Sequence, residues 1–383
     1  MNQQMKLGIP KEIFENETRV SLTPQSAKKI VQKNIEVLIE SGAGSSALFF
    51  DKQYEESGCK IISNAKELYS LSDLIIKIRT PEISEIEFMK ENSFLVSLFQ
   101  PSTDHEKIKL LTKKKISAFS LEYIPRITRA QNMDVLSSMS TVAGYKAVLI
   151  AAESLPKFFP MLMTAAGTIS PAKVFVIGAG VAGLQAIATA RRLGAVVEAF
   201  DTRKIAKEQV ESLGARFVEL DLQGEQTEGE GGYAKQLSKE LHEKELELIA
   251  KQVKKADVVI TTALIPAKKA PVLITEKMVK EMQPGSVIVD LAAEQGGNCE
   301  LTKPGEKITL FDVIICGYLN LPSLMPFHAS QMFSKNMESL ISHLIKEGQL
   351  NINLEDEINK GALISHEGII LTENIKQLLQ GVK

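Results

Sequence analysis

The chain has 383 residues, of which 44% are hydrophobic and 24% are charged, and its formal net charge is −2. This composition is that of an ordinary globular protein, and the length predicts two domains or slightly more. The near-neutral charge argues against a nucleic-acid-binding protein, which would carry a basic surplus. The three cysteines show no C-x-x-C spacing, so we expect a reducing compartment and neither a thiolate zinc site nor a disulfide framework.

Targeting and membrane-spanning segments are not expected. The N-terminal MNQQMKLGIPKE lacks the apolar core of a signal peptide. The most apolar long stretch runs from Ala147 to Thr168, but Glu153, Lys157 and two prolines interrupt it. A bilayer span requires about 20 mostly apolar residues. We therefore expect no direct membrane insertion.

The first third of the chain alternates short apolar runs with helix-like segments. Predicted strands lie in KLGIPKE, IEVLIE, DLIIKIR and SFLVSLF, and predicted helices run from Thr23 to Lys33 and from about Asn64 to Leu71. Continuous apolar strands are typical of a parallel sheet that is buried on both faces. The turn GAGSSA after IEVLIE is either a second nucleotide site or a tight turn in a nucleotide-free domain. We favour the plain turn because a lone glycine pair is weak evidence.

The alanine-rich stretch Ser140–Ala165 predicts a pair of helices that connects two domains. A second α/β unit follows, with apolar strands in KVFVIG, VVEAFD, ARFVEL, DVVITTAL, SVIVDLA and VIICGY. A helix from about Ser330 to Lys346 closes this unit, and GALISHEGIIL predicts a hairpin that returns to the first domain. We thus predict an α/β fold of two Rossmann-like domains with parallel sheets, joined by long helices. The first comprises residues 1–139 plus 325–383, and the second comprises 140–324.

A glycine motif stands between a predicted strand and a predicted helix of the second unit. Gly178, Gly180 and Gly183 form G-x-G-x-x-G. In this motif the first glycine allows a tight turn, the second lets a pyrophosphate approach the backbone, and the third lets helix and strand pack closely. Asp201 ends the next strand about 20 residues later, where an acidic side chain accepts a hydrogen bond from the ribose 2′-hydroxyl. The phosphates lie at the helix N-terminus, so the motif predicts a dinucleotide site.

The acidic residue also indicates which dinucleotide is bound. The carboxylate of Asp201 repels the 2′-phosphate of NADP. Arg203 and Lys204 follow closely and in principle accommodate that phosphate, but they lie beyond the strand end. We therefore favour NAD.

A polar segment interrupts the second unit. DLQGEQTEGEGG, residues 221–232, contains four glycines and no apolar periodicity. Two interpretations stay open: a mobile lid that Tyr233 helps to close over a ligand, and a plain flexible insertion.

Acid–base machinery is not evident. None of the five histidines belongs to a metal pattern such as H-E-x-x-H, and we expect no metal site. The chain also contains no G-x-S-x-G and no P-loop motif. A dehydrogenase of alcohols or amino acids must move a proton and needs a base. The sequence offers a cofactor site without such a base.

Several segments resemble the NAD(H)-binding component, domain I, of proton-translocating nicotinamide nucleotide transhydrogenases and, less closely, the alanine dehydrogenases. They are KLGIPKEIFENETRVSLTP, GAGVAGLQAIATARRLGAVVEAFDTR, TTALIP and GSVIVDLA. PRITRAQNMDVLSS is similar to the transhydrogenase signature that borders the nicotinamide, and GGYAK to the mobile loop whose tyrosine closes over the nucleotide. The resemblance implies catalytic roles for Arg126, Gln131, Asp134 and Ser137. It implies cofactor contacts at Val181, Thr202, Gly232, Tyr233 and Leu264.

Two segments depart from the alanine dehydrogenases. Where those enzymes have a lysine in KVKEP and a histidine in an LHLA-like stretch, this chain reads KIRTPE and SLFQPS, so Arg79 replaces the lysine and no histidine is present. Direct hydride transfer between two nicotinamides requires no substrate proton to be removed, only positioning and the exclusion of water. We expect Gln131 to hydrogen-bond the carboxamide and Arg126 to pair with Asp134 across the loop.

The resemblance implies a subunit of a Re/Si-specific, proton-translocating NAD(P) transhydrogenase. Hydride would pass between NAD(H) on this chain and NADP(H) on a partner domain, coupled to proton movement through a separate membrane-embedded subunit. The chain would be a homodimer, peripheral on the inner face of the cytoplasmic membrane and active only with its partners. The alternatives are a self-sufficient NAD-dependent amino-acid dehydrogenase of the alanine type and a nucleotide-binding interaction subunit without a redox role.

Overall fold

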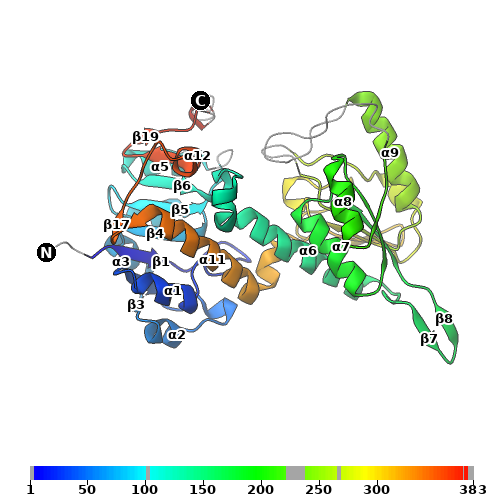
Figure 1. Cartoon of the computed structure of the whole chain (residues 1–383), viewed down its shortest axis with the longest axis horizontal. Coiled ribbons are helices and arrows are strands. Elements are labelled where there is room, and N and C mark those ends of the chain that lie inside the picture. The colour runs from blue at the N-terminus through cyan, green and yellow to red at the C-terminus, as the bar shows by residue number, and fades with distance from the viewer. Residues whose placement is uncertain (1–3, 101–103, 221–237, 265–268, 374, 378–383) are drawn as a thin grey trace. The chain divides into compact units, whose positions relative to one another are not determined.

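The computed structural model describes residues 4–100, 104–220, 238–264, 269–373 and 375–377 (Figure 1). The chain divides into two compact units: unit 1 comprises Met1–Met139 with Ser323–Lys383, and unit 2 comprises Ser140–Pro322. Each unit contains one large, mainly parallel sheet with helices packed against it. The predicted α/β class is confirmed.

Unit 1 contains an eight-stranded sheet in the order β19-β18-β6-β5-β4-β1-β2-β3. The strands β1 to β6 are parallel, whereas β18 and β19 extend the β6 edge in antiparallel fashion. The hairpin predicted in GALISHEGIIL is therefore confirmed. The strands are β1 (Lys6–Ile9), β2 (Glu36–Glu40), β3 (Lys60–Ile62), β4 (Leu74–Arg79), β5 (Phe94–Leu98), β6 (Ser117–Ser120), β18 (Leu363–His366) and β19 (Ile369–Ile370).

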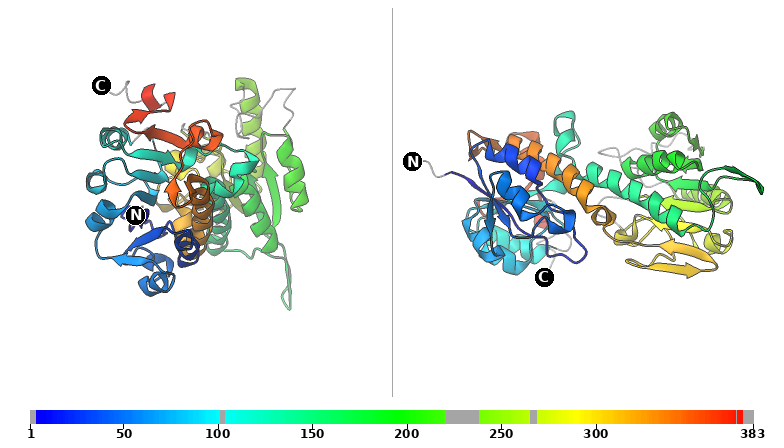
Figure 2. Two further views of the ribbon diagram at one scale, coloured as in Figure 1. Left: turned by 60° about the vertical axis from the view of Figure 1, so that its left-hand side comes forward. Right: turned by 90° about the horizontal axis from the view of Figure 1, so that it is seen from below.

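The helices of unit 1 cover both faces of this sheet. They are α1 (Pro24–Val31), α2 (Asp51–Glu56), α3 (Ala65–Leu71), α4 (Ile83–Phe88), α5 (His105–Lys113), α11 (Pro326–Leu344) and α12 (Glu357–Ala362). Tyr69, Ile86 and Leu111 from α3, α4 and α5 pack in one core with β-strand residues. On the other face α1 and α11 contact each other (Figure 2).

Helix α11 differs from its prediction. It begins at Pro326, before the predicted start, and belongs to unit 1, to which the predicted domain bounds also assign residues 325–383. The separate prediction that this helix closes the second unit is wrong. The reason lies in long-range hydrogen bonds. The hydroxyl of Ser330 accepts the backbone N–H of Val20 at 3.0 Å, and that of Ser334 accepts the N–H of Thr23 at 2.9 Å.

Unit 2 contains a seven-stranded sheet in the order β11-β10-β9-β12-β13-β15-β14. All pairs are parallel except that of the edge strand β14 with β15. The sequence did not predict β14, because an edge strand that is mostly exposed lacks an apolar run. The strands are β9 (Lys173–Ile177), β10 (Val196–Phe200), β11 (Arg216–Phe217), β12 (Val258–Thr261), β13 (Val287–Asp290), β14 (Lys307–Leu310) and β15 (Val313–Cys316).

Alternate strand residues of unit 2 face two separate cores. Val174 and Val176 pack with helices α6, α7 and α8, whereas Phe175 and Ile177 pack with α9 and α10. This alternation explains the continuous apolar runs, because both faces are buried. The helices are α6 (Val135–Ser154), α7 (Val181–Arg192), α8 (Ile205–Ser212), α9 (Lys239–Val253) and α10 (Glu276–Lys280).

The predicted helix pair over Ser140–Ala165 is wrong. A single helix, α6, is followed by a hairpin of β7 (Leu162–Thr164) and β8 (Gly167–Ile169). Pro156 and Pro160 explain the difference, because proline lacks the N–H that a helix needs and restricts the residue before it. The hairpin projects from the body of unit 2 (Figures 1 and 2).

Helix α6 is the one helix, within the described residues, that is long and apolar enough to cross a membrane by length and composition. A core helix of a soluble protein passes the same test, so this observation is weak evidence for a span. Ala147, Val148 and Ala151 of α6 pack in the core of unit 2. The apolar character of α6 is therefore accounted for by burial against the sheet.

Candidate functional site

The strand order of unit 2 reverses at β9, which has β10 on one side and β12 on the other. In doubly wound sheets ligands bind outside the carboxyl ends of the strands at such a reversal. The turn from Gly178 to Gly180 follows β9 at this point, and α7 begins at once with Val181. The predicted glycine motif therefore lies where the topology of the sheet predicts a ligand.

Each glycine of the G-x-G-x-x-G motif has a different role. Gly178 has a φ of +94°, and a Cβ there would lie 2.5 Å from the Thr262 hydroxyl oxygen. A Cβ at Gly183 would lie 1.8 Å from the carbonyl oxygen of Gly178, so this glycine permits the contact of α7 with the turn. At Gly180 no described atom lies within 4 Å of the corresponding position. Neighbouring atoms therefore pack closely against Gly178 and Gly183, whereas the described residues leave space at Gly180, as a pyrophosphate requires.

Helix α6 packs closely against the first turn of α7. Gly144 of α6 faces it, and a Cβ there would lie 2.1 Å from the carbonyl oxygen of Ala182. Val181, the first residue of α7, is 40% exposed. The first N–H groups of a helix have no intrahelical partner, and together with the helix dipole they favour an anion.

Asp201 follows β10 directly and connects it to the glycine turn. Its buried carboxylate accepts the backbone N–H of Ala179 at 2.7 Å and that of Arg203 at 2.8 Å. The Arg203 guanidinium pairs with the same carboxylate, at 2.9 Å for Nε and 2.7 Å for Nη2. Asp201 therefore fixes the turn and carries the negative charge at the position predicted for the ribose.

The end of β12 forms the other side of the turn, and two of its contacts are absent from the sequence prediction. The hydroxyl of Thr262 donates to the Gly178 carbonyl at 3.0 Å. The side chain of Asn298 accepts the Ala263 N–H at 3.0 Å and donates to the Ala263 carbonyl at 2.9 Å. Thr262 lies in TTALIP and Asn298 in GGNCE, and their roles become visible only through these contacts. Leu264 follows and is 38% exposed.

The structure divides the predicted site residues into two groups. At the carboxyl ends of β9, β10 and β12 lie Gly178, Gly180, Val181, Gly183, Asp201, Thr202, Arg203 and Leu264. In unit 1 lie Arg126, Gln131, Asp134 and Ser137. Gly232, Tyr233 and the predicted lid fall outside the described residues.

Asp134 directly precedes helix α6. Its carboxylate accepts the backbone N–H of Ser137 at 2.9 Å and the Ser137 hydroxyl at 2.6 Å. This is the geometry of a helix N-cap, in which a side chain satisfies an N–H of the first turn. The pairing of Asp134 with Arg126 stays a prediction.

The segment that carries Gln131 is the 3-10 helix η3 (Thr128–Met133). The amide of Asn336 in α11 donates to the Asn132 carbonyl at 2.8 Å, and Arg129 pairs with Asp356 at 2.6 Å. These contacts hold η3 within unit 1 and leave the Gln131 side chain exposed. An exposed side-chain amide on a fixed segment is able to form hydrogen bonds with a ligand.

The turn GAGSSA in unit 1 contrasts with the turn after β9. Asp51 accepts the backbone N–H of Gly42 at 2.9 Å and the Ser41 hydroxyl at 2.7 Å. A Cβ at Gly44 would lie 2.5 Å from the Phe49 carbonyl oxygen. Gly42, with a φ of +75°, thus serves the turn conformation, Gly44 serves packing, and the carboxylate of Asp51 binds the turn amide. This geometry favours the plain turn over a second nucleotide site.

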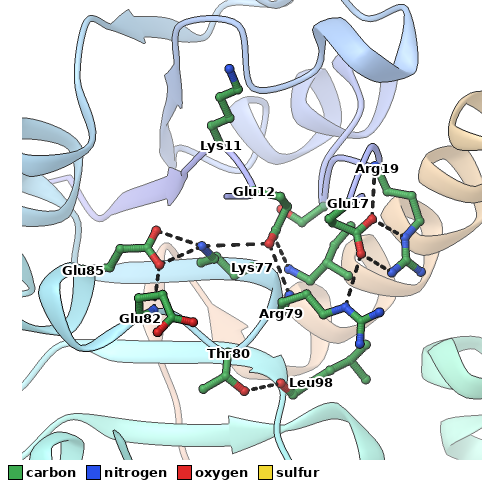
Figure 3. A network of polar contacts seen from close by, with 12 residues as sticks. Lys11, Glu12, Glu17, Arg19, Lys77, Arg79, Thr80, Glu82, Glu85 and Leu98 are labelled. Carbon is green, nitrogen blue, oxygen red and sulfur yellow. Dashed lines mark hydrogen bonds and ion pairs between the residues drawn. The ribbon is translucent and has the colours of Figure 1, made fainter. Parts of the chain in front are cut away.

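A buried ionic network occupies the strand reversal of unit 1, where β4 and β2 flank β1 (Figure 3). Glu12 accepts the Ile78 N–H at 2.6 Å, and its other oxygen lies 3.9 Å from the Lys77 ammonium. Lys77 pairs with Glu85 at 2.8 Å. Burial raises the pKa of Glu12 to about 7, although Lys77 and the backbone N–H oppose the rise. Side chains of the chain itself therefore fill this reversal.

Arg79 belongs to the same network. Its Nε donates to Glu17 at 3.3 Å, and its guanidinium lies 5.0 Å from the centre of the Phe14 ring. Burial alone would raise the pKa of Glu17, but hydrogen bonds and charge from Arg19 lower it to about 2. Because an arginine stays protonated in proteins, Arg79 supplies no base in this network.

Comparisons with known proteins agree with this geometry. Residues 8–143 match the alanine dehydrogenase/PNT N-terminal domain, and residues 147–373 match the alanine dehydrogenase/PNT C-terminal domain. One relative is the first part of the NAD(P) transhydrogenase alpha subunit from Rhodospirillum rubrum. It is 46% identical over 375 residues, which cover 96% of this chain and 98% of that protein. The alanine dehydrogenase of Methanococcus maripaludis is 34% identical over 313 residues, which cover 80% and 76%.

A solved structure supports the same relation. The transhydrogenase from Sinorhizobium meliloti superposes with a TM-score of 0.85 at 38% identity, over 96% of this chain and 99% of that one. Both family domains are present, and the identity is higher to the transhydrogenase subunit than to the alanine dehydrogenase. The chain belongs to the alanine dehydrogenase/PNT family, within which it is a relative of the alpha subunit of NAD(P) transhydrogenases.

Proposed function

We propose that this chain is the NAD(H)-binding subunit of a proton-translocating NAD(P) transhydrogenase. Hydride passes directly between NAD(H) on this chain and NADP(H) on a partner domain. The observation that carries the proposal is the turn after β9, which is open at Gly180 and bordered by the carboxylate of Asp201. The names of the relatives supply the reaction class.

The described residues fit a bound dinucleotide. The space at Gly180 admits the pyrophosphate, the start of α7 stabilises its charge, and Asp201 accepts the ribose hydroxyls. NAD(H), when bound, supplies or accepts the hydride. Val181, Thr202, Arg203 and Leu264 border the same edge of the sheet, and Gly232 and Tyr233 are the proposed covering residues.

The residues of unit 1 have positioning roles in this proposal. Gln131 donates a hydrogen bond to the nicotinamide carboxamide from its fixed segment, and Arg126 contacts the nucleotide. Asp134 and Ser137 fix the segment to the start of α6 through their mutual hydrogen bonds. The rate gain comes from holding one nicotinamide against the other and excluding water.

Partners follow from the same proposal. The name of the Rhodospirillum rubrum relative describes one portion of an alpha subunit, which implies further subunits in that protein. For this chain we propose an NADP(H)-binding subunit and a membrane-embedded subunit that conducts protons. The chain itself forms a homodimer that is peripheral on the inner face of the cytoplasmic membrane.

The alternative, an alanine-dehydrogenase-like enzyme, needs a base for the amino acid. At the corresponding positions this chain has Arg79, which pairs with Glu17, and SLFQPS without a histidine. A third function, nucleotide binding without redox chemistry, predicts NADH binding and no transfer.

Hydride transfer from NADPH to an NAD⁺ analogue tests the proposal. This chain is mixed with the NADP(H)-binding domain of a transhydrogenase, and each component alone is the control. We expect fast transfer only in the mixture. If the mixture shows no hydride transfer although NADH still binds, the proposal is refuted. Turnover of pyruvate, ammonia and NADH by the isolated chain would then establish the alanine-dehydrogenase-like enzyme instead.

A further inference from the structure

The acceptor sites of the Asp201 carboxylate are fully used by the protein. Oδ1 accepts the backbone N–H of Arg203 at 2.8 Å and its Nε–H at 2.9 Å. Oδ2 accepts the Ala179 N–H and the Arg203 Nη2–H, both at 2.7 Å. An ionised carboxylate offers about four lone-pair sites. A ribose hydroxyl therefore has no lone pair to donate to until one of these four donors leaves.

Only one of these donor groups is able to leave without moving the backbone. The N–H of Ala179 belongs to the backbone of the glycine turn, and the N–H of Arg203 belongs to the backbone of the bend that follows β10. The guanidinium of Arg203 is instead carried by a flexible side chain. The side chains of Asp201 and Arg203 are only 5% and 16% exposed, so water competes little with their pairing.

We infer that Arg203 is a specificity-determining residue, whose guanidinium occupies the ribose-hydroxyl position on Asp201 and is displaced when the nucleotide binds. This inference rests on the proposed function, because it concerns the same site. The ribose binds only to molecules in which the ion pair between Asp201 and Arg203 is broken. The apparent affinity for the ribose is therefore the intrinsic affinity multiplied by the fraction of such molecules.

The pair also changes how the site responds to a 2′-phosphate. A bare carboxylate repels that phosphate, whereas a carboxylate paired with a guanidinium is close to neutral. The displaced guanidinium stays near the ribose, where it attracts an anion. Arg203 thus weakens the binding of a ribose with a free 2′-hydroxyl and reduces the repulsion of a 2′-phosphate. Both effects make the preference for NAD over NADP smaller.

The test is Arg203→Leu in the full chain, with adenosine and adenosine 2′-monophosphate as probes. Adenosine has the ribose hydroxyls and no phosphate, so it reports on competition alone. We expect its Kd to fall about tenfold, which corresponds to a pair that is closed in about nine molecules of ten. The Kd of adenosine 2′-monophosphate rises, because Asp201 is then bare. Ligand-detected NMR titration measures both.

Arg216→Leu is the matched control. Arg216 is an exposed arginine of the same sheet, and it pairs with Glu198 on β10 at 2.9 Å. Its loss removes the same charge, and we expect both affinities to stay unchanged. Arg203→Lys keeps the charge but loses the bidentate fork, so adenosine binds more tightly than in the wild type and less tightly than in Arg203→Leu.

The outcomes separate the inference from the proposed function. Adenosine binding that is weaker or unchanged in Arg203→Leu overturns the inference, as does tighter binding of the 2′-phosphate. A wild-type chain that binds neither adenosine nor NADH refutes the proposed function itself. Circular dichroism spectra establish that each variant is folded, and Arg203→Lys decides the matter if Arg203→Leu does not fold.

Discussion

Alanine substitutions at two glycines of the G-x-G-x-x-G motif are predicted to have opposite effects on stability. In Gly183→Ala the new Cβ would lie 1.8 Å from a backbone carbonyl oxygen, and ordinary contact begins at 3.4 Å. The helix and the turn must therefore separate, and neither is a flexible side chain that yields. Overpacking typically costs about 1–3 kcal/mol, and we expect a loss near the upper end, about 3 kcal/mol.

Gly180→Ala meets no such obstacle. Gly180 has a φ of −76°, which alanine adopts readily, and the space around the new methyl group is open among the described residues. Replacing a glycine at a compatible position stabilises a protein by about 0.4–1 kcal/mol through the unfolded state. The methyl group instead fills the space that the pyrophosphate needs. We expect unchanged or higher stability and at least a tenfold loss of NADH affinity, about 1.4 kcal/mol.

Two assays separate these effects. Urea unfolding followed by circular dichroism measures stability, and the fluorescence of NADH measures binding without interference from tryptophan, of which the chain has none. Equal stability of the two variants would refute the packing argument at Gly183. Wild-type NADH binding by Gly180→Ala would refute the location of the pyrophosphate.

Three further predictions concern unit 1. The pKa of Glu12 is raised from 4.5 to about 7, so its contribution to stability is present below pH 4.5 and is lost as the pH rises through 7; Glu12→Gln flattens the urea-midpoint profile over this range, and an unchanged profile would contradict the assignment. Asp134→Ala removes the cap of α6 and lowers the free energy of unfolding by about 1 kcal/mol, whereas Asp134→Asn keeps an acceptor and most of the stability. Gln131→Asn spares NADH binding in a fluorescence titration but slows hydride transfer in the mixture with the partner domain; an unchanged transfer rate would remove Gln131 from the proposed site.

The buried parts of both sheets were predictable because parallel strands covered on both faces must be apolar throughout. The glycine motif was predictable for a related reason, since its three positions need glycine for conformation, access and packing. The edge strand β14 lacked a signal because it is mostly exposed. The membership of α11 in unit 1 depends on hydroxyl contacts with residues near the N-terminus, which no local pattern encodes.

The candidate site shows the same limit. Residue type and spacing indicated Asp201, but the occupation of its oxygens by Arg203 depends on side-chain conformation. Likewise Asp134 was predictable as a member of a polar loop, and its capping of α6 became visible only in three dimensions. The catalytic and cofactor roles assigned to these residues stay predictions.

The contacts between the two ends of unit 1 have a consequence for synthesis on the ribosome. The Thr18 hydroxyl donates to the Ser323 carbonyl at 2.5 Å, and the Ser323 hydroxyl donates to Glu17 at 2.7 Å. All of unit 2 is translated between these partners. At about 5–20 residues per second, unit 2 alone takes roughly 10–40 s to translate, and the N-terminal strands wait at least this long for α11 and β18.

Unit 2 is continuous in sequence, so it is able to complete its sheet first. During the delay the apolar face that α11 later covers is exposed, and β6 is an unpaired edge. Newly made chains are therefore expected to need protection from aggregation in proportion to the time spent translating unit 2. A pause placed between residues 140 and 322 would lower the yield of folded protein, whereas the same pause after α11 would not.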